Sequence, residues 1–287
     1  MKKPIGIIGS VLILACVYAF SNGDIKEELK NQFYVSPKAK SVTNNGSDKK
    51  LLDIKYEPRK YPENYAVVND NKVELSAKDK KLIDKKGDKN FWSQYQNLDK
   101  DGRSGEVKAL VTHKSVEDNA TKNKKRPAFD YKTHVAGEYS DGRYDSTKGT
   151  WLGGHSNNKI MQLKGYKGYL YNKSHSLAWS LGGDMKTHNL TLGTRSQNVG
   201  TNKTKDGGGM GYAEEKVRNV VTNKKNTKVY YKVTPVYKGD ELIPRGSHVQ
   251  AKSINDNGKS ITLNTWVFNK EEGVNINYHN GNWKIAE

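Results

Sequence analysis

Cysteine is nearly absent from this sequence. Among its 287 residues the one cysteine is Cys16, close to the N-terminus. One cysteine cannot form a disulfide bond within the chain, and the rest of the sequence has no thiol to act as a nucleophile. A cysteine hydrolase and a cysteine-ligated zinc site are therefore both excluded.

Acidic residues are scarce relative to basic ones. The chain has 31 Asp and Glu against 49 Lys and Arg, a formal net charge of +18. A surplus of this size indicates a polyanionic partner, such as nucleic acid, an anionic membrane surface or an acidic cell-wall polymer. Lysines that only keep a basic protein in solution are the simpler alternative.

Long apolar runs are confined to the N-terminus. Two lysines precede an apolar stretch from about Pro4 to Phe20, which is the pattern of an export signal. The stretch is also close to the ~17-residue lower limit for a membrane anchor. We expect residues 1–21 to be a signal peptide or signal anchor. A lipoprotein site at Cys16 fits less well, because apolar residues continue past it. The protein is then extracellular, either secreted or tethered to the outer face of the cytoplasmic membrane.

The next segment is polar. Residues 22–60 are rich in Lys, Asn and Ser and poor in apolar residues, which predicts a polar, basic linker. We expect order to begin near Tyr61 and one folded domain to occupy residues 61–287. The apolar content of 34%, with 17 Tyr and 5 Trp, is enough for a core in that part.

Apolar periodicity indicates the main elements of the domain. Alternation predicts strands over 105–117, 228–239, 247–254 and 260–269. A helix is predicted over 208–221, where the apolar residues Ala213, Val217, Val220 and Val221 share one face. Ser76 is placed to cap a shorter helix. The combination predicts an α+β fold with a mostly antiparallel central sheet.

Polar residues suited to phosphodiester chemistry occur between residues 172 and 218. A neutral histidine such as His175 can act as a general base near neutral pH. An asparagine carbonyl, at Asn189 or Asn198, can hold a hard cation that keeps most of its waters. Glu214 and Arg218 are four residues apart and lie on one face of the predicted helix. By spacing alone, a polar loop and a solvated ion pair explain the same residues.

The order of motifs in this region is more specific. Asn172-Lys173-Ser174-His175 is followed by Ser-Leu-Ala-Trp-Ser-Leu-Gly-Gly. Further stretches are HNLTLGTRSQNVG (188–200), GGMGYAEEKVRNVV (208–221), YQNLDKDGR (95–103), YYKVTPVYKGDELIPRG (230–246) and VNINYHNG (274–281). In this order they resemble the DNA/RNA non-specific endonuclease family, the ββα-metal or His-Me finger nucleases. The likeness is to streptodornase-type secreted DNases and membrane-anchored DNA-entry nucleases, and it covers roughly residues 65–281.

The resemblance implies a nuclease domain over residues 61–287, with a ββα-metal finger carrying the active site. It implies metal-dependent endonucleolytic hydrolysis of DNA, with RNA as a further candidate substrate, to 5′-phosphate ends. The family's general base falls on His175, its metal ligand on Asn198 and its supporting asparagine on Asn189. Glu214 then acts on water at the metal, and Arg218 contacts the phosphate.

The resemblance also implies partners. The expected cofactor is Mg²⁺, which Mn²⁺ can replace. Lys173, Gln197 and Arg195 are expected to contact the substrate through its phosphate backbone, and no obligate protein partner is expected. Lys173 stands where the family has arginine, so the bidentate fork of a guanidinium is lost there.

An alternative from another class is a non-catalytic surface receptor that holds DNA without cutting it. Five other histidines are interpreted as structural or surface residues: His113 in a strand, and His155, His188, His248 and His279. Arg103 is interpreted as a structural ion pair. Arg126, in a basic loop, receives no role from the sequence.

Overall fold

The computed structural model describes residues 40–44, 46–163, 166–201 and 207–286, which belong to one compact unit. The expected signal or anchor over residues 1–21, and the expected linker as far as residue 39, lie outside the described residues. Within the described ranges, no helix is long and apolar enough to cross a membrane.

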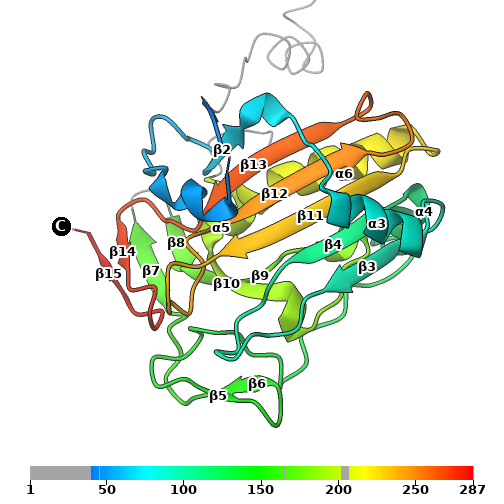
Figure 1. Ribbon diagram of the computed structural model, residues 1–287. Helices are drawn as coiled ribbons and strands as arrows, with labels where there is room; N and C mark the ends of the chain where they lie inside the picture. The colour runs from blue at the N-terminus through cyan, green and yellow to red at the C-terminus, as the bar shows by residue number, and fades with distance from the viewer. Residues whose placement is uncertain (1–39, 45, 164–165, 202–206, 287) are drawn as a thin grey trace, which may run out of the picture. The chain divides into compact units, whose positions relative to one another are not determined.

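A seven-stranded sheet lies at the centre of this unit, in the order β1-β2-β13-β12-β11-β4-β3 (Figure 1). Neighbouring strands run antiparallel except for β1 and β2, which are parallel. The strands are β1 (Ser41–Val42), β2 (Tyr65–Val68), β3 (Trp92–Tyr95), β4 (Val107–Val111), β11 (Val229–Val236), β12 (Gly246–Ser253) and β13 (Thr262–Phe268). The predicted α+β class with a mostly antiparallel central sheet is confirmed.

Helix α6 (Gly209–Asn223) covers one face of the sheet. The predicted apolar face is buried, with Ala213, Val217 and Val221 fully inaccessible to solvent. These side chains share a hydrophobic cluster with Val229 and Tyr231 of β11. Because the two β11 residues are two positions apart, they project from the same side of the strand.

Helix α3 (Ala77–Lys86) lies on the opposite face. Its predicted cap is present, since the Asp79 N–H donates to the Ser76 hydroxyl at 3.1 Å. The Asp79 carboxylate reaches the sheet, where it accepts from the Tyr230 hydroxyl at 2.7 Å and pairs with the Lys108 ammonium at 2.9 Å. Tyr230 therefore contacts α3 on one face of the sheet, and its neighbour Tyr231 packs with α6 on the other.

Short elements complete the unit. Apart from α5, which is described below, the other helices of the described residues are η1 (Asp48–Asp53), η2 (Asn69–Asn71), α4 (His113–Asp118), η3 (Trp179–Leu181) and η4 (Thr187–Asn189). Three hairpins pair β5 (Arg143–Asp145) with β6 (Thr150–Leu152), β7 (Ile160–Leu163) with β8 (Tyr166–Tyr169), and β14 (Val274–Ile276) with β15 (Trp283–Ile285). His113 begins α4 and does not lie in a strand as expected, because the Thr112 hydroxyl caps that helix by accepting from the Ser115 N–H.

The folded unit begins earlier in the chain than Tyr61. Leu51 of η1 is fully buried in a cluster with Tyr61, Trp266 and Phe268, and β1 pairs with β2. The expected linker over residues 22–60 is therefore wrong from residue 40 onward. The segment DKKLLD has one fully buried side chain, Leu51, among charged neighbours. It has no apolar periodicity, so its sequence resembles that of a linker.

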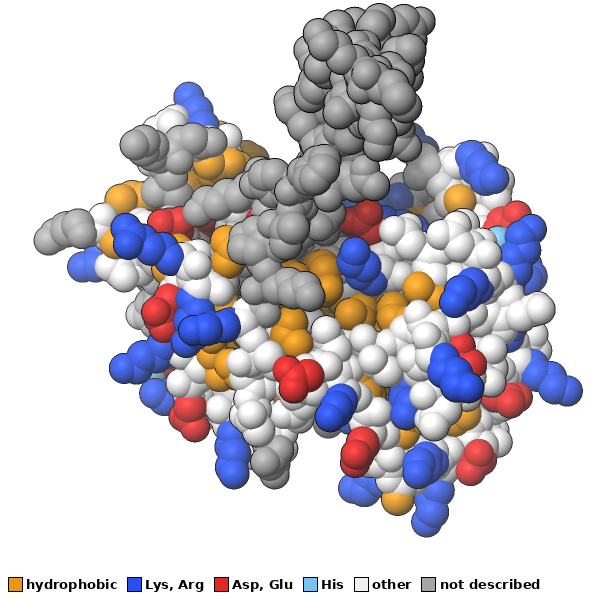
Figure 2. All heavy atoms as spheres, turned by 90° about the horizontal axis from the view of Figure 1, so that it is seen from above, with side chains coloured by type: hydrophobic (Ala, Val, Ile, Leu, Met, Phe, Trp, Pro, Cys, Tyr) orange, Lys and Arg blue, Asp and Glu red, His pale blue; other side chains and the backbone are white. Residues whose placement is uncertain are grey.

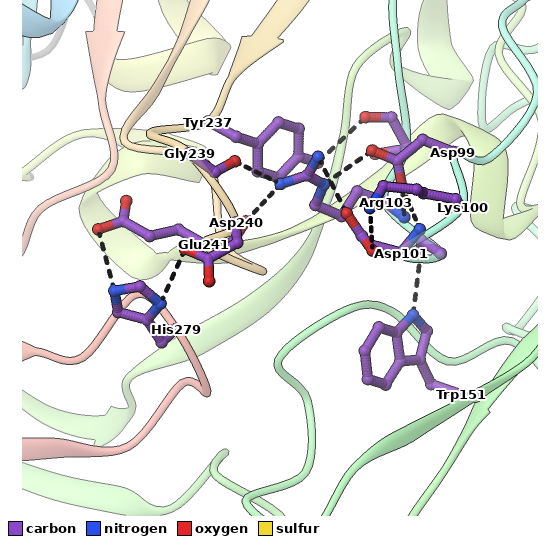
Figure 3. Close-up of polar contacts among 12 residues, drawn as sticks. Asp99, Lys100, Asp101, Arg103, Trp151, Tyr237, Gly239, Asp240, Glu241 and His279 are labelled. Carbon is purple, nitrogen blue, oxygen red and sulfur yellow. Dashed lines mark hydrogen bonds and ion pairs between the residues drawn. The ribbon is translucent and has the colours of Figure 1, made fainter.

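Arg103 joins the loop before β4 to the connection between β11 and β12 (Figure 3). Its Nε donates to the Asp99 carboxylate at 2.8 Å. Its Nη1 donates to the carbonyls of Gly239, at 2.9 Å, and Glu241, at 3.1 Å, and its guanidinium lies 4.8 Å from the centroid of the Tyr237 ring. The expectation of a structural ion pair at Arg103 is confirmed.

The next residue, Ser104, connects the loop around Arg103 to the strand that contains Leu190. The Ser104 hydroxyl donates to the carbonyl of Leu190 at 2.8 Å, and the Ser104 carbonyl accepts from the Tyr237 hydroxyl at 3.0 Å. Leu190 is paired with His175 across a hairpin. The loop around Arg103 therefore holds the strand opposite the candidate base.

Candidate active site

The candidate site is built on a compact ββα unit. Strands β9 (Tyr171–His175) and β10 (Leu190–Thr194) form an antiparallel hairpin that leads directly into helix α5 (Arg195–Val199). Helix α5 crosses close over the hairpin: a Cβ on Gly193 would lie 2.1 Å from the Gln197 side-chain oxygen. Glycine at position 193 leaves room for the buried Gln197 side chain, which a larger residue would displace, and the helix residues lie next to β9.

His175 occupies the end of β9 and is 9% exposed. Its ring stacks on Phe129 at a centroid distance of 5.7 Å, and its Nε2 lies 3.2 Å from the Met185 sulfur. Burial lowers the pKa of His175 to about 4, with a further lowering from the charge of Arg126 and a smaller opposing effect of Asp184. The imidazole is therefore neutral, and able to accept a proton, at neutral pH.

Asn189 holds the loop that follows His175. Its side-chain NH₂ donates to the carbonyls of Leu177, at 2.9 Å, and Asp184, at 2.8 Å, and its Oδ1 accepts from the Leu177 N–H at 2.8 Å. This fully buried amide closes the loop between β9 and β10 at both ends. Its position suits a supporting residue, because all three of these bonds join the amide to the backbone of the loop.

The Gly-Gly pair in this loop has a steric cause. Gly182 ends η3 in the left-handed region at φ 109°. A Cβ on Gly183 would lie 1.9 Å from the carbonyl oxygen of Leu177, a backbone atom that cannot move aside. The loop can therefore fold back against the Asn189 brace only with glycine at these positions.

Asn198 lies in α5, next to the hairpin. Its Oδ1 accepts from the Ser174 hydroxyl at 3.0 Å, and Ser174 directly precedes His175. The side chain is half-buried. The structure thus brings the predicted base and the predicted metal ligand onto neighbouring elements of one motif.

Helix α6 packs against α5 and carries the other two candidates. Burial raises the pKa of Glu214 to about 7, although the charges of Arg218 and Arg126 act in the opposite direction. The Arg218 guanidinium lies 3.4 Å from the Ser180 hydroxyl in the loop after His175. A carboxyl with a pKa near 7 can hold or release a proton at working pH.

Arg126 is the residue that the sequence leaves without a role. It is exposed, its guanidinium lies 5.6 Å from the Phe129 ring, and its charge lowers the pKa of both His175 and Glu214. The loop around it has no periodic pattern, so its place beside the site could not be derived from spacing. Its basic sequence, KNKKR, is the one signal that points to an anion.

Two of the three expected substrate contacts, Lys173 and Arg195, have other partners within the fold. The Lys173 ammonium donates to the carbonyl of Thr133 and pairs with Glu138 at 3.2 Å. Gln197 is 1% exposed, so its side chain has no direct path to a substrate. Arg195 lies with its guanidinium 5.7 Å from the Tyr166 ring. Contact with substrate stays a prediction for Lys173 and Arg195, and the geometry gives it no support at Gln197.

The histidines interpreted as structural have partners of their own. His188 pairs with Asp184 at 2.8 Å and stacks on Tyr95. His248 is held between the side chains of Asp48 and Asn264.

Basic side chains are spread over the surface. On the face shown in Figure 2, lysine and arginine side chains stand singly or in small groups with acidic side chains between them. Beside the candidate site, the cations of the loop from Lys122 to Arg126 are all exposed. The expected polyanion contact is therefore best placed on this loop.

Comparisons with known proteins agree with the motif. The model of the DNA/RNA non-specific endonuclease family matches residues 153–255, which include the whole ββα unit and α6. A curated deoxyribonuclease from Streptococcus dysgalactiae subsp. equisimilis is 38% identical over 148 residues, covering 50% of this chain and 43% of that protein. The chain thus matches less than half the length of that relative.

Solved structures share the fold. The structure of Sda1 nuclease with a bound zinc ion superposes with a TM-score of 0.64 and 28% identity, covering 80% of this chain and all of that one. NucA from Streptococcus agalactiae with magnesium bound gives a TM-score of 0.52 and 20% identity, covering 78% of this chain and 87% of that one, a likeness of fold. The mixed sheet and the ββα unit are those of a His-Me finger nuclease fold. Over residues 153–255 the chain matches the DNA/RNA non-specific endonuclease family.

Proposed function

We propose that this protein is an exported, metal-dependent endonuclease that hydrolyses phosphodiester bonds of DNA, with RNA as a further candidate substrate. The observation that carries the proposal is a buried histidine with a pKa of about 4 at the end of β9, in a chain that matches the non-specific endonuclease family over residues 153–255. A histidine in this state can take a proton from water at neutral pH.

In this proposal His175 is the general base. It accepts a proton from the attacking water, which approaches the phosphorus in line with the leaving 3′-oxygen. That oxygen takes a proton from water in the site, and the products are 5′-phosphate and 3′-hydroxyl ends. Arg218 and Arg126 stabilise the charge that builds up on the phosphate oxygens. Asn189 positions the loop that follows the base.

The donor atoms fit a hard divalent cation. Asn198 would hold it through its amide oxygen, and Glu214 on the neighbouring helix would act on the water around it. A single neutral oxygen ligand suits Mg²⁺, which keeps several of its waters, and Mn²⁺ can substitute. No group of three or more His, Cys, Asp and Glu side chains that could enclose a metal occurs among the described residues. The bound cation would supply positive charge beside the scissile phosphate.

Contacts to phosphates carry no sequence information, so we propose cleavage with little base specificity. The exposed cations of residues 122–126 are suited to the backbone of DNA or RNA and make binding salt-sensitive. No obligate protein partner is needed for the reaction.

Export is also a proposal. We assign residues 1–21 to a signal peptide or a retained anchor, and the nuclease domain to the unit that begins at residue 40. Mass spectrometry of the mature N-terminus, combined with cell fractionation, distinguishes a cleaved from a retained segment.

A plasmid digest tests the activity. The purified protein should degrade DNA with Mg²⁺ and stop with EDTA. His175→Ala should cleave at least ~100-fold more slowly, since a general base contributes about 10²–10⁴-fold, yet bind DNA normally in gel shifts. The matched control is His155→Ala, because that exposed histidine pairs with Asp141 away from the ββα unit and should leave cleavage unchanged. DNA that stays intact with Mg²⁺ but shifts in gels would instead support a non-catalytic receptor.

A further inference from the structure

The segment from Arg126 to Thr133 lies against the candidate base. Phe129 stacks on the His175 ring at 5.7 Å, and the cations of Arg126 and Lys173 lie 5.6 Å and 5.7 Å from the Phe129 centroid. At the other end of the segment, the Thr133 carbonyl accepts from the Lys173 ammonium. The segment is therefore attached to β9 at two points on either side of residue 131.

Tyr131 projects from this segment into solvent. It is 78% exposed, more than the other large hydrophobic side chains that the structure describes as exposed. A hydrogen-bonded turn fixes its backbone, since Asp130 accepts from the N–H of Lys132 through its side chain and from the N–H of Thr133 through its carbonyl. The Thr150 hydroxyl also donates to the Lys132 carbonyl at 2.6 Å. These bonds fix the backbone that carries the exposed ring, and the ring takes no part in the three hydrophobic clusters.

A single exposed aromatic ring is ordinary on a protein surface. The position of Tyr131 is what distinguishes it. The ring is two residues from the Phe129 that covers the base, and the exposed cations Lys124, Lys125 and Arg126 precede it in the chain. The Lys132 ammonium lies 5.2 Å from the ring centroid. An aromatic face among backbone-binding cations is the arrangement with which proteins bind unpaired nucleic acid bases.

We propose that Tyr131 is a stacking platform for one nucleobase of the substrate strand, next to the scissile phosphate. This inference rests on the proposed function and deepens it. Bases within a duplex are stacked on one another, so this ring can engage only a base that is unpaired, frayed or turned out of the helix. Tyr131 therefore favours single-stranded DNA, or DNA opened locally at the site of cleavage.

Steady-state kinetics test this proposal. Tyr131→Ala should raise KM for a short single-stranded oligonucleotide about tenfold, the scale of one lost base stack, with kcat within about twofold. A closed duplex of the same sequence should show a much smaller change in KM. Tyr131→Trp should restore the wild-type KM, because indole presents a larger aromatic face.

The matched control is Tyr169→Ala. Tyr169 is 55% exposed on the β7–β8 hairpin, where it pairs across the strands with Ile160, and its removal should leave both values of KM unchanged. An equal rise of KM for single strand and duplex in Tyr131→Ala, or a wild-type KM for both, would overturn the inference.

A binding measurement separates this inference from the proposed function. With EDTA present to prevent cleavage, an oligonucleotide carrying 2-aminopurine should lose fluorescence on wild-type protein through stacking, and keep it on Tyr131→Ala. If the fluorescence is quenched but the protein does not cleave DNA in Mg²⁺, the proposed nuclease activity is rejected and base stacking on Tyr131 is supported. Normal cleavage with no Tyr131-dependent quenching would reject the platform alone.

Discussion

His175 owes its neutral state to burial and not to a carboxylate that orients it. The nearest charges act in opposite directions on its pKa: Arg126 lowers it and Asp184 raises it, and the result after burial is about 4. A base with this pKa is unprotonated over most of the pH range in which DNA is stable. The lowered pKa also makes the imidazole a weaker base, which takes a proton from water less readily.

The pH dependence of cleavage should report this environment. We expect the acid limb of kcat/KM to lie well below pH 6.5, the ordinary pKa of histidine. Arg126→Gln removes a positive charge and so stabilises the protonated imidazole, which raises the pKa of His175 and moves the acid limb to higher pH. The plateau of kcat/KM should fall about tenfold, the scale of one lost hydrogen bond to a charged group.

The control for this profile is Arg143→Gln. Arg143 is an exposed arginine of β5, and its loss should leave the acid limb in place. Identical limbs in wild type and Arg126→Gln would contradict the role given to Arg126.

At the scale of elements, α5 is too short to be stable alone. Its first turn is fixed from outside: the Thr194 hydroxyl accepts from the Gln197 N–H at 2.9 Å, and the Glu271 carboxylate accepts from Ser196, from its N–H at 3.0 Å and its hydroxyl at 2.7 Å. Glu271 follows β13 and is distant in sequence. It is a positioning residue for the helix that carries Asn198.

Loosening α5 should weaken metal binding at the proposed site. We expect Glu271→Ala to raise the Mg²⁺ concentration for half-maximal cleavage about tenfold, as for other residues that orient a metal ligand. Glu271→Gln should fall between, because its amide oxygen still accepts one of the two bonds. Initial rates over a Mg²⁺ titration measure both variants. The exposed Glu74, on the segment before α3, provides the control Glu74→Gln. A wild-type titration in folded Glu271→Ala would remove the positioning role.

The sequence was informative for some elements and silent for others. Helix α6 and strands β4, β11, β12 and β13 have regular apolar periods, because each buries a face against the core, and their positions could be predicted. Strand β9, with the sequence YNKSH, has no such period, and resemblance alone located it. Its geometry depends on contacts from afar, such as the bond from Ser104 to the carbonyl of Leu190. Spacing contains no information on contacts of that kind.

At the scale of the whole molecule, the N-terminal segment from residue 40 is part of the body. Asp48 pairs with His248 at 2.8 Å, and the other ring nitrogen of His248 lies 2.6 Å from the Asn264 side-chain oxygen. Asp48 and His248 are 200 residues apart in the chain. A polar composition therefore misled the boundary prediction, because polar contacts across the fold hold this segment in addition to its apolar ones.

The charged network under α3 should govern stability in acid. Burial raises the pKa of Asp79, but hydrogen bonds from Lys108 and Tyr230 outweigh it and hold the pKa well below its usual value. A carboxylate with a lower pKa in the folded state stabilises the fold above about pH 4, and this contribution is lost as the pH falls toward the folded pKa. The network thus makes folding of the whole unit sensitive to acid.

Replacing the Asp79 carboxylate should remove its contribution to the free energy of unfolding and the pH dependence of that contribution. We expect Asp79→Asn to lower the free energy of unfolding by about 2 kcal/mol at pH 7, because Asp79 loses its charge-assisted bond to Lys108, while Lys108 keeps its ion pair with Glu106 at 2.8 Å. Near pH 3 the difference from wild type should be smaller, since the unfolded wild-type carboxylate is then largely protonated. Urea denaturation at both pH values measures it. Asp84→Asn, exposed on the same helix, should change stability by less than about 0.5 kcal/mol at either pH. An equal loss in Asp79→Asn at pH 7 and pH 3 would assign the effect to packing, because a contribution from charge must follow the titration of Asp79.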